Sequence, residues 1–167
     1  MRGLRVTLRR SLPDRFTLVG LGNPASGDDA FGYYVARRLA PLRAPGFRAV
    51  PAGIWLERLP PSDDPVVLVD AVMGRFKPGT IAVVRDPEPE WWVDGHRVGL
   101  ARLNVRLLIG FAPVRVGPGE RMSEEAREAA RTVIRVVRDV VLERVEGPPD
   151  AGLRGGPPLP GGRRAGP

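Results

Sequence analysis

The sequence predicts a three-layer α/β/α sandwich on a mixed, mostly parallel sheet of about five strands. Strand-like and helix-like patterns alternate along the chain, and this alternation is typical of α/β domains. One predicted strand, Pro65–Val72, is apolar on both faces, as expected for a central strand of a parallel sheet. The length of 167 residues, with 43% hydrophobic residues, suits one domain with a substantial core.

A glycine-rich loop joins the first predicted strand to the first predicted helix. Residues 16–21 form a short apolar run that Gly and Pro close, which indicates a buried strand. The helix is expected to begin at Asp28 or Asp29 and to end near Ala40, just before a proline. Its apolar residues recur on one face, at Phe31, Val35 and Leu39.

Further strands and one long helix are expected in the rest of the chain. The predicted strands are 47–52, 65–72, 79–84 and 105–112, with a helical turn at 54–59 and an irregular connection at 85–95. The long helix spans Ser123–Val145, because a Ser-Glu-Glu start precedes a regular face of valines. Since ligand residues gather where strands end, the loop after residue 21 and Asp70 become candidates.

The ends of the chain differ in composition from its middle. Residues 1–15 are predicted to be a basic N-terminal extension, and residues 16–146 a single α/β domain. Of the 21 glycines and 19 prolines, 13 fall in residues 147–167. This last segment is predicted to be a disordered tail, because it has little apolar mass to bury.

The net charge of +7 resides mostly at these ends. Residues 1–15 contribute +4 and residues 147–167 contribute +2, which leaves +1 for the middle of the chain. A dedicated nucleic-acid binder needs a basic face on the fold itself, so no specific nucleic-acid partner is expected. The cytoplasm is the expected compartment, with no membrane insertion, because no apolar run could span a bilayer and the N-terminus lacks a secretion signal.

The counts of cysteine and histidine exclude several classes of site. With no cysteine, the chain cannot form disulfides, zinc ribbons or a cysteine-protease site. With one histidine, His96, it cannot form the two-histidine helix of metalloproteases. A triad of Ser26 with His96 would need a coincidence of folding, because no serine lies in a Gly-x-Ser-x-Gly turn.

The glycine loop allows more than one interpretation. A strand, a glycine loop and a helix start suit a phosphate, but Ala25 stands where the dinucleotide fingerprint needs glycine. Two carboxylates at the helix start, Asp28 and Asp29, would also repel a pyrophosphate. These carboxylates could instead cap the helix and complement its dipole.

Three residues at or after strand ends form a possible metal site. Asp29, Asp70 and His96 would offer two carboxylates and one imidazole nitrogen, which suit a divalent first-row metal. The set is incomplete as a protein-only site, so water or substrate would supply the remaining ligands. Each residue also has an ordinary alternative: a helix cap for Asp29, a solvated strand end for Asp70 and a surface position for His96.

In several motifs the sequence resembles the hydrogenase maturation protease family, endopeptidases that process the large subunit of nickel–iron hydrogenases. The first motif is Gly20-Leu21-Gly22-Asn23 followed by Asp28-Asp29-Ala30-Phe31-Gly32. The others are the apolar strand ending Asp70-Ala71, the Pro78-Gly79-Thr80 turn and the run His96-Arg97-Val98-Gly99-Leu100-Ala101. The resemblance covers roughly residues 16–145 and implies a sandwich of the phosphorylase/hydrolase-like type.

The resemblance implies a function and a role for each matching residue. The chain is expected to remove the C-terminal extension of a nickel-loaded hydrogenase large-subunit precursor, acting as a monomer. Asp29, Asp70 and His96 are the implied catalytic residues and nickel contacts. Nickel is expected to arrive with the substrate rather than to be held permanently. Residues implied to support the site are Gly20, Gly22, Asn23 and Asp28.

Two alternatives share parts of this pattern. A catalytically degenerate relative would bind a hydrogenase subunit or another partner without cleaving it. The run Val19-Gly20-Leu21-Gly22-Asn23-Pro24 also resembles the opening of peptidyl-tRNA hydrolase. That enzyme needs a histidine about ten residues after the asparagine as its base, and this chain has none there.

Overall fold

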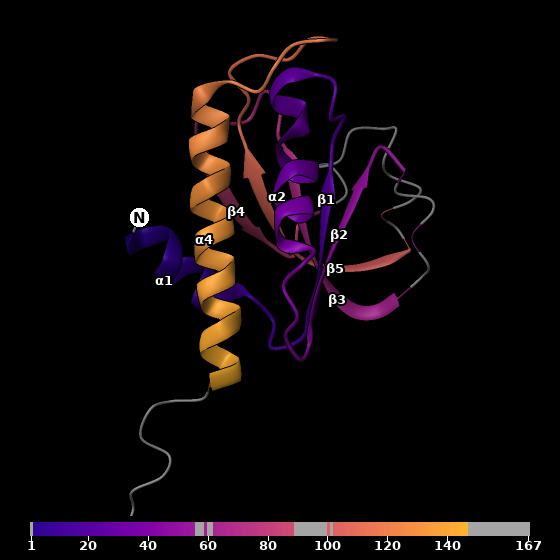
Figure 1. Cartoon of the computed structure of the whole chain (residues 1–167), viewed down its shortest axis with the longest axis vertical. Coiled ribbons are helices and arrows are strands. Elements are labelled where there is room, and N and C mark those ends of the chain that lie inside the picture. Colours follow the sequence, from indigo (N-terminus) through magenta and orange to yellow (C-terminus); the bar gives the residue numbers. More distant parts are fainter. Residues whose placement is uncertain (1, 56–58, 60–61, 89–99, 101, 147–167) are drawn as a thin grey trace, which may run out of the picture.

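One five-stranded mixed sheet forms the centre of the computed structural model (Figure 1). The structure describes residues 2–55, 59, 62–88, 100 and 102–146. The strands lie in the order β2-β1-β3-β5-β4, and only β4, which pairs with β5, is antiparallel to its neighbour. This confirms the predicted mixed, mostly parallel sheet. The strands are β1 (Phe16–Leu21), β2 (Phe47–Gly53), β3 (Ser62–Ala71), β4 (Ile81–Arg85) and β5 (Leu103–Phe111).

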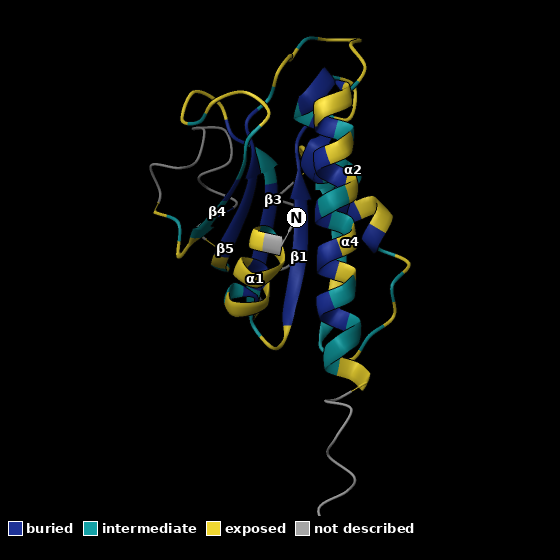
Figure 2. Ribbon diagram, turned by 90° about the vertical axis from the view of Figure 1, so that its left-hand side faces the viewer, coloured by how far each residue is buried: buried dark blue, intermediate teal, exposed yellow. Residues whose placement is uncertain are grey.

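The two most apolar runs of the sequence occupy interior positions of the sheet. Every residue of β1 is buried, and β3 is buried from Val66 to Val69 (Figure 2). Their parallel pairing aligns Val19 with Leu68 and Gly20 with Val69. Because both faces of these strands are covered, nearly continuous apolar sequences are favoured there over alternating ones. The edge strand β4 is less buried than either of them, with three of its five residues half-buried and one exposed.

The described α-helices pack on one face of the sheet. One core cluster joins α1 (Arg2–Ser11), α2 (Phe31–Leu39) and α4 (Glu124–Glu146) to the side chains of alternate strand residues. In this cluster Phe31 stacks on Phe111 of β5, with ring centroids 4.9 Å apart. The predicted helix at 28–40 is divided, because a short 3₁₀ turn, η1 (Gly27–Ala30), precedes α2.

A second apolar cluster lies on the opposite face of the sheet. It contains Leu21, Leu68 and Leu108 from three adjacent strands, with Leu100 packed among them. Within the part of the chain that the structure describes, no α-helix covers this face. The described residues therefore include one of the two helical layers that the predicted sandwich requires. The predicted tail at 147–167 and most of the predicted turn at 54–59 lie outside the described residues.

An N-terminal helix extends the folded domain beyond its expected start at residue 16. In α1, Leu8 is fully buried, and Leu12 just after the helix is 5% exposed. The guanidinium groups of Arg5 and Arg9 pair with Glu143 of α4. Four arginines in ten helical residues mask the short apolar stripe in the sequence, so periodicity alone did not predict this helix.

Among the described residues, no helix combines the length and the apolar character needed to cross a lipid bilayer. The 23-residue helix α4 is long enough, but it carries charged side chains throughout.

Leu8→Ala tests whether α1 is part of the core. The fully buried side chain leaves a cavity when truncated, so we expect the free energy of unfolding to fall by about 2–4 kcal/mol in urea titrations. Val6→Ala, on the same helix but 50% exposed, is the matched control and should change it by less than about 0.5 kcal/mol. Equal losses for the two variants would contradict a core role for α1.

Candidate active site at the carboxyl edge of the sheet

Asp70 lies at the carboxyl edge of the sheet, where the parallel strands end. It is the second-to-last residue of β3 and pairs with Gly110 of β5, while the preceding Val69 pairs with Gly20 of β1. Three parallel strands therefore end around one carboxyl group. In open α/β sheets this edge is the usual position for ligand-binding residues.

Two glycines let helix α2 begin directly against these strand ends. A Cβ atom on Gly32 would lie 1.9 Å from the carbonyl oxygen of Val69. A Cβ atom on Gly20 would lie 2.0 Å from the carbonyl oxygen of Gly32. Only glycine permits such close approach of the two backbones. The first turn of α2 is thus held against β1 and β3, and the preceding Asp29 is brought beside Asp70.

The glycine–asparagine loop fixes the carboxylate of Asp29. Gly22 has φ +103°, and a Cβ atom there would lie 1.7 Å from the carbonyl oxygen of Asp29. The backbone N–H of Asn23 donates to Asp29 Oδ2 at 2.8 Å. The side chain of Asn23 folds the same loop, because its Oδ1 accepts a hydrogen bond from the Ala25 N–H at 3.0 Å. Because the backbone N–H of Asn23 already donates to Asp29, it is not available to bind a phosphate. This argues against a dinucleotide site in the loop.

The carboxyl group of Asp70 lacks a positive partner among the described residues. It accepts one hydrogen bond, from the Ala71 N–H to Oδ1 at 2.8 Å. Burial, opposed by the Ala71 hydrogen bond and aided by the negative charge of Asp29, raises the pKa of Asp70 to about 7. Asp29 and Asp70 thus form a carboxylate pair whose repulsion a bound cation would relieve.

Asp28 has the opposite environment, although it is the neighbour of Asp29 in sequence. Its fully buried carboxylate accepts hydrogen bonds from the N–H groups of Val114, Arg115 and Ser123 and from the Ser123 hydroxyl, at 2.6–3.1 Å. Burial alone would raise the pKa of Asp28, but these hydrogen bonds outweigh it and hold the pKa below its ordinary value.

The structure therefore gives Asp28 a structural role in the loop between β5 and α4. The alternative interpretation that Asp28 caps its own helix is wrong, because its oxygens accept hydrogen bonds from amides of this distant loop. Ser123 caps α4 as predicted, with its Oγ accepting from the Ala126 N–H at 3.1 Å. The contact between Asp28 and Ser123 spans 95 residues, and no local sequence signal predicts it.

The structure brings together two of the three residues predicted to form the metal site. Asp29 and Asp70 are neighbours at the carboxyl edge, whereas His96 lies outside the described residues. Over residues 2–55, 59, 62–88, 100 and 102–146, no group of three His, Cys, Asp or Glu side chains could hold a metal ion. The supporting residues Gly20, Gly22, Asn23 and Asp28 all contact the loop that carries Asp29 or determine its path.

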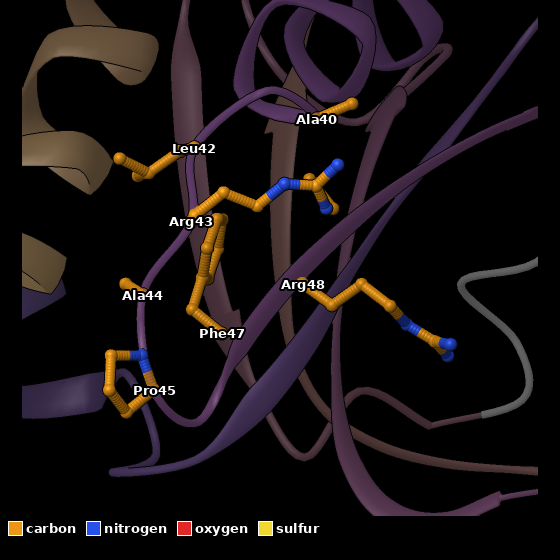
Figure 3. Close-up of a pocket in the computed structure, with 8 residues that line it drawn as sticks. Ala40, Leu42, Arg43, Ala44, Pro45, Phe47 and Arg48 are labelled. Carbon is orange, nitrogen blue, oxygen red and sulfur yellow. The ribbon is translucent and has the colours of Figure 1, made fainter.

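A separate cavity of about 550 Å³ lies at the opposite edge of the sheet (Figure 3). It is lined by the connection between α2 and β2, including Leu42, Arg43 and Phe47. Phe47 pairs with Phe16, the first residue of β1, so the cavity adjoins the amino ends of the strands. It is therefore remote from Asp29 and Asp70 and takes no part in their chemistry.

Asp28→Asn tests the structural role of Asp28. The new amide nitrogen cannot accept the hydrogen bonds that the carboxylate accepts, so we expect a loss of about 2–4 kcal/mol of unfolding free energy in urea titrations. Asp29→Asn is the matched control, because it also removes one charge but lies partly exposed and relieves repulsion with Asp70. Its effect should stay below about 1 kcal/mol, and a larger loss for Asp29→Asn than for Asp28→Asn would refute this assignment.

The raised pKa of Asp70 predicts that stability falls as the pH rises. The group has a pKa of about 7 when folded and 3.8 as the ordinary value, so the folded chain holds this proton more tightly than the unfolded chain. The protonated Asp70 contributes to the free energy of unfolding below pH 4, and this contribution is lost between about pH 4 and 7. At pH 8, in chelator, Asp70→Asn should therefore be more stable than the unchanged chain by about 1–2 kcal/mol, with the difference vanishing near pH 4. Urea titrations across this range measure it, and a less stable variant at pH 8 would contradict the burial of an uncompensated charge.

Comparison with known proteins identifies relatives in structure but not in sequence. No family model matches the chain, and no curated protein matches it.

The fold is shared with several solved structures. A [NiFe] hydrogenase maturation protease HycI from Thermococcus kodakarensis KOD1 has 22% identity and a TM-score of 0.62, over 84% of this chain and 99% of that one. The hydrogenase maturating endopeptidase HybD from E. coli has 20% identity and a TM-score of 0.62, over 77% and 93%. A hydrogenase 2 maturation peptidase from a Thaumarchaeota archaeon has 22% identity and a TM-score of 0.56, over 75% and 96%. The fold expected from the sequence motifs is thereby confirmed: this chain has the fold seen in hydrogenase maturation proteases.

Proposed function

We propose that this chain is an endopeptidase that removes the C-terminal extension from the precursor of a nickel–iron hydrogenase large subunit. The observation that carries the proposal is the pairing of Asp29 with Asp70 at the carboxyl edge, without a positive side chain among the described residues to compensate them. Support also comes from the matching sequence motifs and from the fold shared with maturation proteases.

Nickel fits this site as part of the substrate. Carboxylate oxygens bind divalent first-row metals, and a cation beside Asp70 would favour its ionised form over the protonated form that burial stabilises. Two carboxylates leave most of a metal's coordination positions unfilled, so the precursor would supply further ligands. The proposal assigns His96 to one of the remaining positions, on the basis of the sequence resemblance. Metal affinity of the chain alone should consequently be low.

The residues of this chain would act mainly by positioning. The Asn23 and Ala71 N–H groups each bind one oxygen of a site carboxylate and so orient Asp29 and Asp70 before the substrate arrives. A precursor whose nickel contacts these oxygens is held in one orientation, which places a chosen peptide bond at the edge of the sheet. A nickel ion held by Asp29 and Asp70 would also supply Lewis acidity to a peptide carbonyl or a water molecule, which is the chemistry that hydrolysis needs.

We expect the chain to act in the cytoplasm, as a monomer, on a protein substrate and without a nucleic-acid partner. A substrate-borne metal also explains how one protease could distinguish a finished precursor from an unfinished one, since only the former presents nickel to the carboxylates.

Cleavage of a purified large-subunit precursor, with and without nickel, tests the proposal. After purification in chelator, the chain should shorten the nickel-loaded precursor on a denaturing gel and leave the nickel-free precursor intact. Asp70→Asn should reduce the cleavage rate at least a hundredfold, because it removes a charge that contacts the metal. His96→Ala should reduce cleavage as well.

Asp86→Asn provides the matched control for these variants. Asp86 is 62% exposed and pairs with Arg106 at the other edge of the sheet, so its substitution should leave the rate unchanged. Equal cleavage of both precursor forms would defeat recognition through nickel. Binding of the nickel-loaded precursor without any cleavage would instead identify the chain as a non-cleaving relative.

A further inference from the structure

Exposed apolar side chains are concentrated around the carboxylate pair. Among the described residues, seven large hydrophobic residues are strongly exposed. Five of them lie on the three segments that follow β2, β3 and β5, at the edge of the sheet that carries Asp70. We call these five residues the apolar rim: Ile54, Trp55, Met73, Val114 and Val116, which are 42–60% exposed.

Each segment of the apolar rim is joined to the loop of Asp29 or to the strand of Asp70. Met73 follows Asp70 by three residues, and the intervening Val72 N–H donates to the Phe111 carbonyl at 2.8 Å. Val114 is held by its N–H, which donates to Asp28. Ile54 follows Gly53, whose carbonyl accepts from the Gly22 N–H at 3.2 Å. The rim is therefore a fixed border of the site rather than a set of scattered surface residues.

The charges on the same edge have a definite arrangement. The centre is acidic, with Asp29 and Asp70. The described loops that follow β3 and β5 around it carry more exposed cations than anions, namely Arg75, Lys77, Arg115 and Arg121 against Glu120. A complementary partner therefore presents apolar side chains to the rim, acidic groups outside them and a cation at the centre. This combination describes a polypeptide that carries a metal ion.

We propose that the apolar rim is the docking surface for the precursor polypeptide, and that it sets the affinity for the substrate. This inference rests on the proposed function and extends it from the metal to the protein around the metal. A concentration of exposed apolar side chains beside a site is typical of protein interaction surfaces. Apolar contacts made equally before and during the reaction strengthen binding without accelerating the chemical step.

Serine substitutions in the rim test this inference. Ile54→Ser and Met73→Ser should each raise the KM for the nickel-loaded precursor about tenfold, since each removes most of one buried apolar side chain from the complex. Their kcat should stay within about twofold, because neither side chain belongs to the carboxylate pair. Thermal unfolding should be nearly unchanged, because both residues are about half exposed or more.

The two remaining exposed hydrophobic residues are the matched controls. Val6 and Val145 are each 50% exposed but lie on α1 and at the far end of α4. Val145 is about 30 Å along its helix from Ser123. Val6→Ser and Val145→Ser should leave both KM and kcat unchanged.

Charge reversal tests the basic surroundings separately. The double variant Lys77→Glu, Arg121→Glu should raise KM for the same precursor and make KM less sensitive to salt. Arg10→Glu, on α1 and equally exposed to solvent, is the control and should have no effect. An unchanged KM in the double variant would show that acidic groups of the precursor do not contribute to docking.

The outcomes separate this inference from the proposed function. If the unchanged chain cleaves the precursor and the rim variants behave like the Val6 and Val145 controls, the docking surface is wrong and the protease survives. If the unchanged chain binds the precursor through the rim but does not cleave it, the docking surface stands and the proposed activity fails. If the unchanged chain is a dimer that Met73→Ser converts to a monomer in sedimentation experiments, the rim is an interface between copies and the inference is overturned.

Discussion

The hydrogen bonds to the buried carboxylate of Asp28 connect the two loops on which the site depends. On one side they hold the turn that carries Asp29, and on the other the segment from Val114 to Ser123. Backbone bonds reinforce the connection, including Gly27 N–H to the Glu120 carbonyl at 3.1 Å. Without this anion, three N–H groups and a hydroxyl at buried or part-buried positions would lose their acceptor, which is costly. The start of α4, the rim residue Val114 and the position of Asp29 are thus linked through one side chain.

The three aspartates at this edge have different roles because their burial and hydrogen bonds differ. Asp28 is buried with enough donors to remain an anion, so it acts as a permanent structural acceptor. Asp70 is half-buried with a single donor and a negative neighbour, so its charge is costly until a cation arrives. Asp29 lies between them, with one oxygen bound by the Asn23 amide. The number of hydrogen-bond donors around each carboxylate therefore decides which aspartate is structural and which is left to bind a cation.

Local sequence predicted the parts of the fold and site that depend on local order. The apolar strand ending at Asp70 and the loop ending at Asp29 could be placed at one edge, because parallel strands end together. The separate roles of Asp28 and Asp29 could not be predicted, since they depend on donors from a loop almost a hundred residues away. The sequence did not predict helix α1, because its arginines outnumber its buried leucines. Glu143, the partner of Arg5, lies more than a hundred residues away along the sequence.

The packing of α1 on α4 has a consequence for how the chain reaches its final state. Helix α1, which carries the buried Leu8, packs mainly on a helix that begins at Glu124, so these contacts close a loop of more than a hundred residues. Closing so long a loop has an entropic cost that nearer contacts do not share. During synthesis, the contacts between α1 and α4 can therefore form only after α4 has been made, more than a hundred residues after α1. Strands β1, β2 and β3 all precede α4 in the sequence and can pair before α1 and α4 come together.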